Sequence, residues 1–166
     1  MLTSEDVRYF TDWFMAYTAA FRSEDPATEA NLRYKKEHSL RVRDRMVAIG
    51  RELRLSPEQM TLAETTGLFH DVGRFEQYAR YRTFKDYLTE DHALLGLSIL
   101  ERERVFRGHG SEEEKESIFT AVKYHNKLSI PETVGGDTLV LCQLIRDADK
   151  LDILDQVVRF YENPEK

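Results

Sequence analysis

The sequence has few of the residues that interrupt helices or cross-link chains. It contains one cysteine, four prolines and eight glycines in 166 residues. A single cysteine excludes an intrachain disulfide, and the apolar neighbours of Cys142 indicate a small buried hydrophobic residue. Because Gly and Pro are sparse and strand-like alternation is short and rare, we expect helices rather than strands.

Long apolar runs and an excess of positive charge are also missing. No apolar run approaches the roughly 20 residues that a membrane helix needs, and the acidic start of the chain lacks the apolar core of a signal peptide. We therefore expect a cytoplasmic protein with no membrane partner. The net charge of −6 argues against a general nucleic-acid-binding protein, which would carry a basic face. It leaves room for a local basic pocket for a phosphorylated small molecule.

Length and composition predict one globular domain that spans residues 1–166. The chain is 41% apolar and 33% charged, which is ordinary for a folded protein. It stops soon after the last expected helix, which is compatible with a piece of a longer protein.

Helical spacing of apolar residues predicts an all-α fold with five or more helices. Ser4 precedes a first helix, and Asp25-Pro26 begins a second pattern that runs to about Leu55. Because roughly thirty residues is long for a globular helix, we expect this pattern to break once. Gly73 suits a helix end or a tight turn. Further helices are expected at about 57–70, in part of 74–90, from 91, at 111–125 and at 138–161.

Six side chains that can bind a metal are spread over most of the chain. They are His38, His70, Asp71, His92, His125 and Asp149. Imidazole and carboxylate together suit Mn, Fe, Co, Ni or Zn better than Ca or Mg. A lone histidine is more often a surface or core residue than a ligand, and we interpret His109, between two glycines, in that way.

The spacing of these residues indicates one shared site. Successive helical residues point about 100° apart, so His70 and Asp71 can share a metal only where a helix ends, and Gly73 provides that end. His125 lies near another helix end and His92 near a helix start. Metal sites in helical bundles are built from inward side chains of several helices.

Three stretches resemble the HD-domain metal-dependent phosphohydrolases, over about residues 30–155. They are Glu37-His38-Ser39-Leu40-Arg41-Val42, Leu68-Phe69-His70-Asp71-Val72-Gly73-Arg74 and Ile145-Arg146-Asp147-Ala148-Asp149-Lys150-Leu151-Asp152. The resemblance implies a compact helical bundle with a His/Asp metal site in its core. Residues 1–25 would add an N-terminal helix packed on it.

The resemblance also implies a ligand set. His38, His70, Asp71 and Asp149 would bind a first divalent transition metal. The runs Asp91-His92 and Tyr124-His125-Asn126 are similar to those of the two-metal branch. In that branch Asp71 would bridge two metals, and His92 and His125 would bind the second, so we expect one or two metals per chain.

Other features depart from the best-studied branches of this family. Branches that cleave cyclic dinucleotides carry a Gly-Tyr-Pro motif and a His-His-Glu run, and residues 124–131 contain neither. Arg74 stands where many relatives carry Lys. The resemblance therefore does not specify a substrate.

The expected chemistry is hydrolysis of a phosphate ester or anhydride. A metal lowers the pKa of a bound water from about 16 toward about 7 and polarises a phosphoryl oxygen. Asp71 and Arg74 are the predicted catalytic residues. Arg74 is also the first choice for a phosphate clamp because its planar fork of donors follows the ligand pair, with Lys127 and Arg41 as further substrate-binding candidates.

The predicted partner is a small phosphorylated metabolite, and the aromatic side chains within residues 74–85 suit stacking on a nucleotide base. Two alternatives stay open. One is an HD-type oxygenase that uses two irons to activate dioxygen. The other is a non-catalytic module that senses a nucleotide, against which the six intact ligand candidates argue.

Overall fold

A computed structural model describes residues 1–162. Within them the chain forms seven α-helices, one short 3-10 helix and no strand, which confirms the all-α prediction. In chain order these are α1 (Ser4–Ala19), α2 (Pro26–Glu52), α3 (Pro57–Phe69), α4 (Gly73–Tyr81), the 3-10 helix η1 (Asp86–Leu88), α5 (His92–Arg102), α6 (Glu112–Tyr124) and α7 (Gly136–Glu162).

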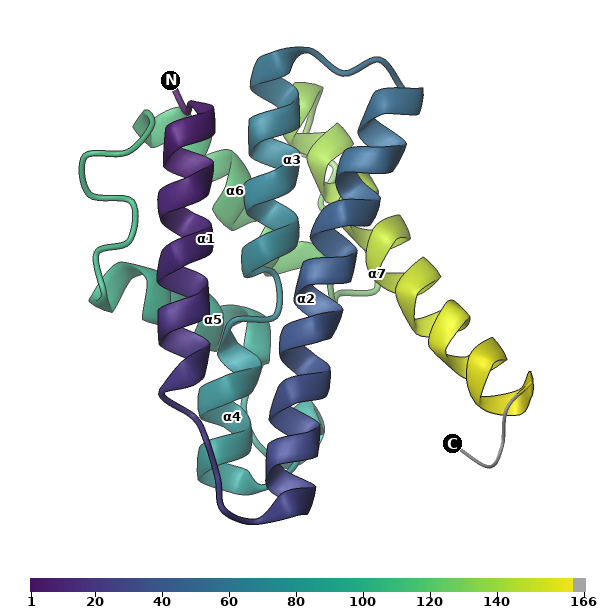
Figure 1. The fold of residues 1–166 in the computed structure, drawn as a ribbon. Coiled ribbons are helices and arrows are strands. Elements are labelled where there is room, and N and C mark those ends of the chain that lie inside the picture. Colours follow the sequence, from purple (N-terminus) through teal and green to yellow (C-terminus); the bar gives the residue numbers. More distant parts are fainter. Residues whose placement is uncertain (163–166) are drawn as a thin grey trace.

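Helix α3 is the centre of a compact bundle. It packs against α1, α2, α6 and α7 (Figure 1). Leu68 and Phe69, at its C-terminal end, are fully buried, and the ring of Phe10 from α1 lies edge-on to Phe69 with centroids 5.5 Å apart. Cys142 is also fully buried in this core, as its apolar neighbours predicted. The bounds of a single domain at residues 1–166 stay a prediction.

The break expected in the second helical pattern is wrong: α2 is one continuous helix of 27 residues. Asp25 caps it by accepting a hydrogen bond from the backbone N–H of Thr28, with Pro26 in the first turn. Neither Pro nor Gly follows until Gly50, so nothing in the sequence interrupts the backbone hydrogen bonds earlier. The helix ends where Arg54 adopts a positive φ of 56°.

Gly73 has a different role from the one that we expected. It does not end a helix but begins α4, directly after the turn that carries His70 and Asp71. A Cβ atom at Gly73 would lie 2.1 Å from the carbonyl oxygen of His92 and 2.6 Å from the backbone nitrogen of Gly96. The glycine therefore allows α4 and α5 to cross at backbone contact, which brings Asp71 and His92 together.

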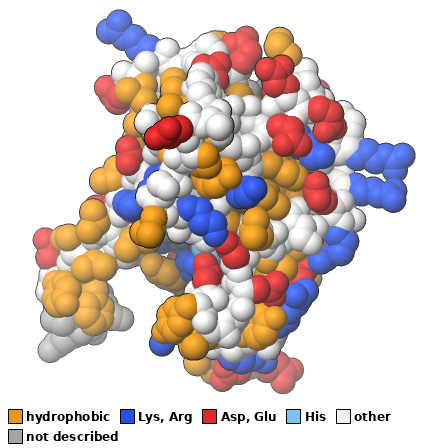
Figure 2. Space-filling view, turned by 180° about the vertical axis from the view of Figure 1, so that it is seen from behind, with side chains coloured by type: hydrophobic (Ala, Val, Ile, Leu, Met, Phe, Trp, Pro, Cys, Tyr) orange, Lys and Arg blue, Asp and Glu red, His pale blue; other side chains and the backbone are white. Residues whose placement is uncertain are grey.

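Helix α7 crosses behind α2 and α3, and its C-terminal half extends away from the bundle as an arm (Figure 1). Hydrophobic side chains gather on this arm, at the lower left of Figure 2. Leu154 is 59% exposed and Val158 is 52% exposed. No described helix is both long enough and apolar enough to cross a membrane.

Candidate metal centre

Five helices bring the six predicted ligands to one place in the core. His38 lies in the middle of α2, and His70 and Asp71 follow the last residue of α3. His92 is the first residue of α5, His125 follows the last residue of α6, and Asp149 lies in α7. All four histidines and Asp71 are at most 4% exposed.

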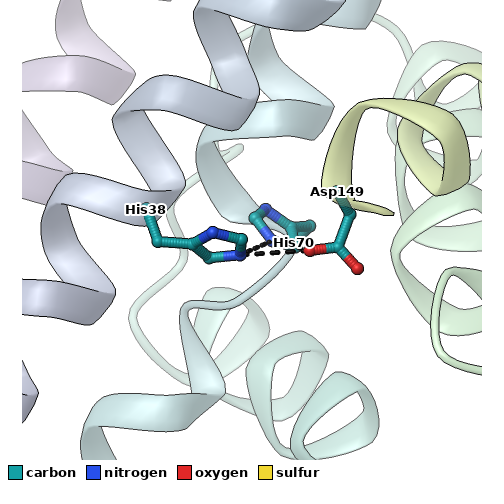
Figure 3. A group of neighbouring side chains, drawn as sticks. All are labelled: His38, His70 and Asp149. Carbon is teal, nitrogen blue, oxygen red and sulfur yellow. Dashed lines mark hydrogen bonds and ion pairs between the residues drawn. The ribbon is translucent and has the colours of Figure 1, made fainter. Parts of the chain in front are cut away.

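His38, His70 and Asp149 form the first cluster, shown in Figure 3. The Nε2 atom of His38 lies 3.1 Å from Oδ1 of Asp149 and 3.3 Å from Nε2 of His70. The His70 Nε2 atom lies 3.8 Å from the same carboxylate oxygen. Three potential ligand atoms from three helices thus point at a common space.

Asp71, His92 and His125 form a second cluster. Oδ1 of Asp71 lies 3.1 Å from Nε2 of His92 and 3.9 Å from Nε2 of His125. Its other oxygen, Oδ2, faces the first cluster at 3.6 Å from the His38 Nε2 atom. Asp71 therefore has one oxygen toward each cluster, which is the geometry that a bridging carboxylate needs.

Backbone carbonyls set the tautomers of two histidines. Nδ1 of His70 lies 2.8 Å from the carbonyl oxygen of Gly67, and Nδ1 of His125 lies 2.6 Å from that of Val122. A carbonyl oxygen only accepts hydrogen bonds, so each Nδ1 is the donor. In the neutral imidazole, Nε2 then presents its lone pair to the centre.

Carboxylates outside the two clusters set the tautomers of the other two histidines, His38 and His92. Nδ1 of His38 donates to Oδ2 of Asp152 at 2.8 Å, and Nδ1 of His92 donates to Oδ2 of Asp86 at 2.6 Å. Such partners orient a ligating histidine and raise its basicity. Asp152 is fully buried and also accepts hydrogen bonds from Arg41.

The resulting pairs of Nε2 atoms fit a cation. The Nε2 atoms of His92 and His125 are 3.0 Å apart, a distance similar to that between His38 and His70. While both imidazoles of a pair are neutral and donate from Nδ1, no hydrogen lies between their Nε2 atoms, and the two lone pairs face and repel each other. A divalent metal that accepts both lone pairs removes this repulsion, and imidazole with carboxylate suits the transition metals.

Burial and charge set the protonation of the centre. Burial lowers the pKa of the His70 imidazole, and it lowers that of His125 to about 3. Burial alone would raise the pKa of the Asp71 carboxyl, but the Lys35 ammonium and the neighbouring histidines outweigh it and hold that pKa well below its usual range. Near neutral pH Asp71 is therefore ionised beside neutral His70 and His125 imidazoles, whereas hydrogen bonds to Asp71 and Asp86 outweigh burial and raise the pKa of His92.

The pKa of His38, unlike those of His70 and His125, is shifted upward. Burial disfavours its charged form, but the hydrogen bond to Asp149 and the charge of Asp71 outweigh burial and raise the pKa of His38. The negative charge of Asp71 and Asp149 that stabilises a proton on Nε2 of His38 would also stabilise a metal cation at the same position.

The three predicted substrate-binding residues lie around the centre, each beside a carboxylate. The Nη1 atom of Arg74 donates to Asp86, to Gln77 and to the carbonyl of Phe84. Its buried Nε atom has no hydrogen-bond partner among the described residues and lies 3.5 Å from Oδ1 of Asp71. Arg41 pairs with Asp152 through two nitrogens, at 2.9 and 3.0 Å.

Lys127 pairs with Asp91, the N-cap residue of α5. His109 takes no part in the centre: it lies in the loop before α6, stacks on Tyr9 and pairs with Asp6.

Sequence reasoning missed three residues of this centre: Lys35, Asp86 and Asp152. Lys35 lies three residues before His38 and Asp152 lies three after Asp149, so helical spacing places each on the face of its predicted ligand. That spacing was an available signal for both. The sequence held no such signal for Asp86, because the conformation of the segment between α4 and α5 brings it from the short helix η1 to His92.

His and Asp side chains from several helices meet in the core of this all-α bundle. Helical proteins build binding sites for divalent metals in this way. A family model described as HD domain matches residues 36–154, so the chain belongs to the HD domain family. The resemblance seen in the sequence is confirmed, and the family places the chain in a superfamily of metal-dependent hydrolases. No curated protein and no solved structure matches the chain.

Proposed function

We propose that the chain hydrolyses a phosphate ester or anhydride of a nucleotide-like small molecule, with one or two divalent transition metals in its centre. The convergence of four Nε2 atoms on Asp71 and Asp149 carries this proposal. Mn, Fe, Co, Ni or Zn would suit these ligands. We expect neither a nucleic acid nor a membrane as partner, and a cytoplasmic location stays a prediction.

In this proposal His38, His70, Asp71 and Asp149 hold the first metal, and Asp71 with His92 and His125 holds the second. When bound, such metals lower the pKa of water and polarise a phosphoryl oxygen. The surrounding helices exclude solvent, since the histidines and Asp71 are nearly fully buried.

The contacts of Arg74 support its role as a phosphate-binding residue. Asp86, Gln77 and the Phe84 carbonyl anchor its Nη1 atom, so the guanidinium is oriented before a substrate arrives. Its free, buried Nε donor lies beside Asp71, where an anionic oxygen would satisfy it. Lys127 and Arg41 would bind substrate only by giving up part of their present pairing.

An exposed aromatic ring beside the centre supports a nucleotide-like substrate. Tyr34 is 40% exposed, and its ring is nearly parallel to that of His38, with centroids 6.3 Å apart. Aromatic faces stack on any base without sequence preference.

The first test is metal analysis of the purified protein, followed by a screen of phosphorylated metabolites with added Mn or Co. We expect close to two metals per chain, falling to about one in His125→Ala. His70→Ala should lose metal and activity while its circular dichroism spectrum stays helical. His109→Ala is the control and should keep its metal content and its activity. Full metal occupancy in His70→Ala would contradict the ligand assignment.

Measurements on the same samples distinguish hydrolysis from the two alternatives, an iron oxygenase and a nucleotide sensor. Consumption of dioxygen by the iron-loaded protein, without phosphate release from any metabolite, would favour the oxygenase. Binding of a nucleotide with neither reaction would favour the sensor.

A further inference from the structure

Within residues 1–162, Lys35 is the one cation that donates a hydrogen bond to one of the six predicted ligands. Its Nζ atom donates to Oδ2 of Asp71 at 2.8 Å, and its side chain is 16% exposed. It lies one helical turn before His38 on α2, and its ammonium is 5.4 Å from the ring centre of Phe84. The side chain thus reaches the ligand carboxylate while a small part of it stays open to solvent.

The other cations near the centre have carboxylate partners outside the ligand set. Arg41 pairs with Asp152, Arg74 with Asp86 and Lys127 with Asp91. Within residues 1–162, the carboxylate that Lys35 contacts is Asp71 alone, and Asp71 is a ligand in the proposed function. Lys35 therefore has no second acid to hold its charge when Asp71 is engaged by a metal.

Two consequences follow from like charges at short range. A divalent cation bound by Asp71 would compete with the Lys35 ammonium for the same oxygen, and the two like charges would repel each other at short range. An anion bound at the centre would relieve this repulsion and accept a hydrogen bond from the ammonium. The flexible stem of lysine, with three donors at its end, allows the small movement from carboxylate to phosphate.

From this geometry we infer that Lys35 binds the phosphate of the substrate and competes with the metals for Asp71. The inference rests on the proposed function and names a residue that would donate a hydrogen bond to the phosphate group of the substrate there. Lys35 and the Nε donor of Arg74 would approach Asp71 from its two oxygens, Oδ2 and Oδ1. A tetrahedral anion between them would then have a donor on each side.

The neighbouring Lys36 provides a matched control. It lies about 100° farther round α2 and lines a separate cavity of about 290 Å³ with Arg22, Arg33 and Phe75. The same substitution there removes an equal charge from the same helix without touching the centre.

The experiment compares the wild type with Lys35→Met, Lys35→Arg and Lys36→Met. Two affinities are measured on the full chain: that for Mn²⁺ in competition with a chelator, and that for inorganic phosphate by calorimetry on the Mn-loaded protein. We expect Lys35→Met to bind Mn²⁺ at least as tightly as the wild type and phosphate about tenfold or more weakly. Lys35→Arg should keep most of the phosphate affinity, and Lys36→Met should change neither.

A loss of phosphate affinity without a loss of Mn²⁺ affinity separates phosphate binding from a purely structural role, which would weaken both affinities. Unchanged phosphate affinity in Lys35→Met, or a parallel loss of both affinities, overturns the inference. Neither outcome depends on turnover. A wild type that takes up metal and phosphate but hydrolyses no metabolite would overturn the proposed function and leave the assignment of Lys35 standing.

Discussion

Single hydrogen bonds decide the chemistry of the centre at the residue scale. His38 and His92 each donate Nδ1–H to a carboxylate, whereas His70 and His125 donate to a carbonyl three residues earlier in the chain. All four imidazoles thereby present Nε2, and no ligand side chain has to change tautomer when a metal binds. The partner of each Nδ1 atom is consequently as important to metal affinity as the ligand itself.

Asp152→Asn tests this dependence at the first cluster. The substitution keeps the size of the side chain but removes the charge that His38 and Arg41 share. We expect metal affinity to fall about ten- to a hundredfold, measured by chelator competition. Asp155→Asn, at an exposed carboxylate that pairs with Arg45, is the control and should keep wild-type affinity. Equal affinities in the two variants would show that Asp152 serves packing alone.

Arg74→Ala tests the phosphate clamp. A charged hydrogen bond contributes about 1.5–3 kcal/mol, so turnover efficiency should fall about ten- to a hundredfold. Arg74→Lys should recover only part of it, because an ammonium cannot reproduce the fork of donors.

Metal content is measured on the same samples, because Arg74 also contacts Asp86, the partner of His92. Unchanged metal content with reduced turnover is expected. Loss of metal would instead mean that Arg74 acts through Asp86. Arg80→Ala, which removes an exposed cation of α4, should have wild-type rates.

At the scale of the elements, the crossing of α4 and α5 holds the two halves of the centre together. Gly73 and Gly96 face each other there, and a Cβ atom at Gly96 would lie 3.1 Å from the Val72 side chain. Asp71 lies two residues before Gly73, and His92 lies four before Gly96, so the spacing of these helices sets the distance between the two ligands.

Gly73→Ala should therefore damage both stability and metal binding. The new methyl group would meet the carbonyl of His92, which is backbone and cannot turn aside. We expect a loss of about 1–3 kcal/mol in the free energy of unfolding and weaker binding of the second metal, measured by urea denaturation and metal titration. A Cβ atom at Gly135 would have none of the described residues within 4 Å beyond its chain neighbours, so Gly135→Ala should behave nearly as the wild type.

At the scale of the whole molecule, the centre links helices from distant parts of the chain, in addition to their apolar packing and to ion pairs such as that of Arg41 with Asp152. The ligands come from α2, α7 and the ends of α3, α5 and α6, so a bound metal connects segments more than a hundred residues apart in the chain. A metal that binds only this folded arrangement stabilises it by mass action.

Removal of metal should lower the melting temperature. At a metal concentration of about a hundred times Kd the stabilisation is about 2.7 kcal/mol, which for a chain of this length corresponds to about 5–10 °C. Scanning calorimetry with and without chelator measures the shift, and His70→Ala should show almost none. An equal shift in that variant would place the stabilising metal elsewhere.

Local sequence was sufficient for most of the helices. Ser56 and Ser111 each form a capping box with the residue three positions later, so the chain itself encodes where α3 and α6 begin. The types and order of the six His and Asp residues, together with the resemblance to a family, were enough to predict a metal site. The length of α2 was not predicted, because the absence of a breaker is a weaker signal than a cap.

Only the tertiary structure decided which distant partners the polar groups of the centre have. His38 and Asp152 are 114 residues apart, and Lys35 and Asp71 are 36 apart, so no local pattern specifies these pairs. The role of Gly73 is decided in the same way, because its neighbour across the crossing is Gly96 on another helix. Caps and apolar spacing act within a few residues, whereas tautomers, charge pairing and backbone contact between helices depend on which surfaces the folded chain brings together.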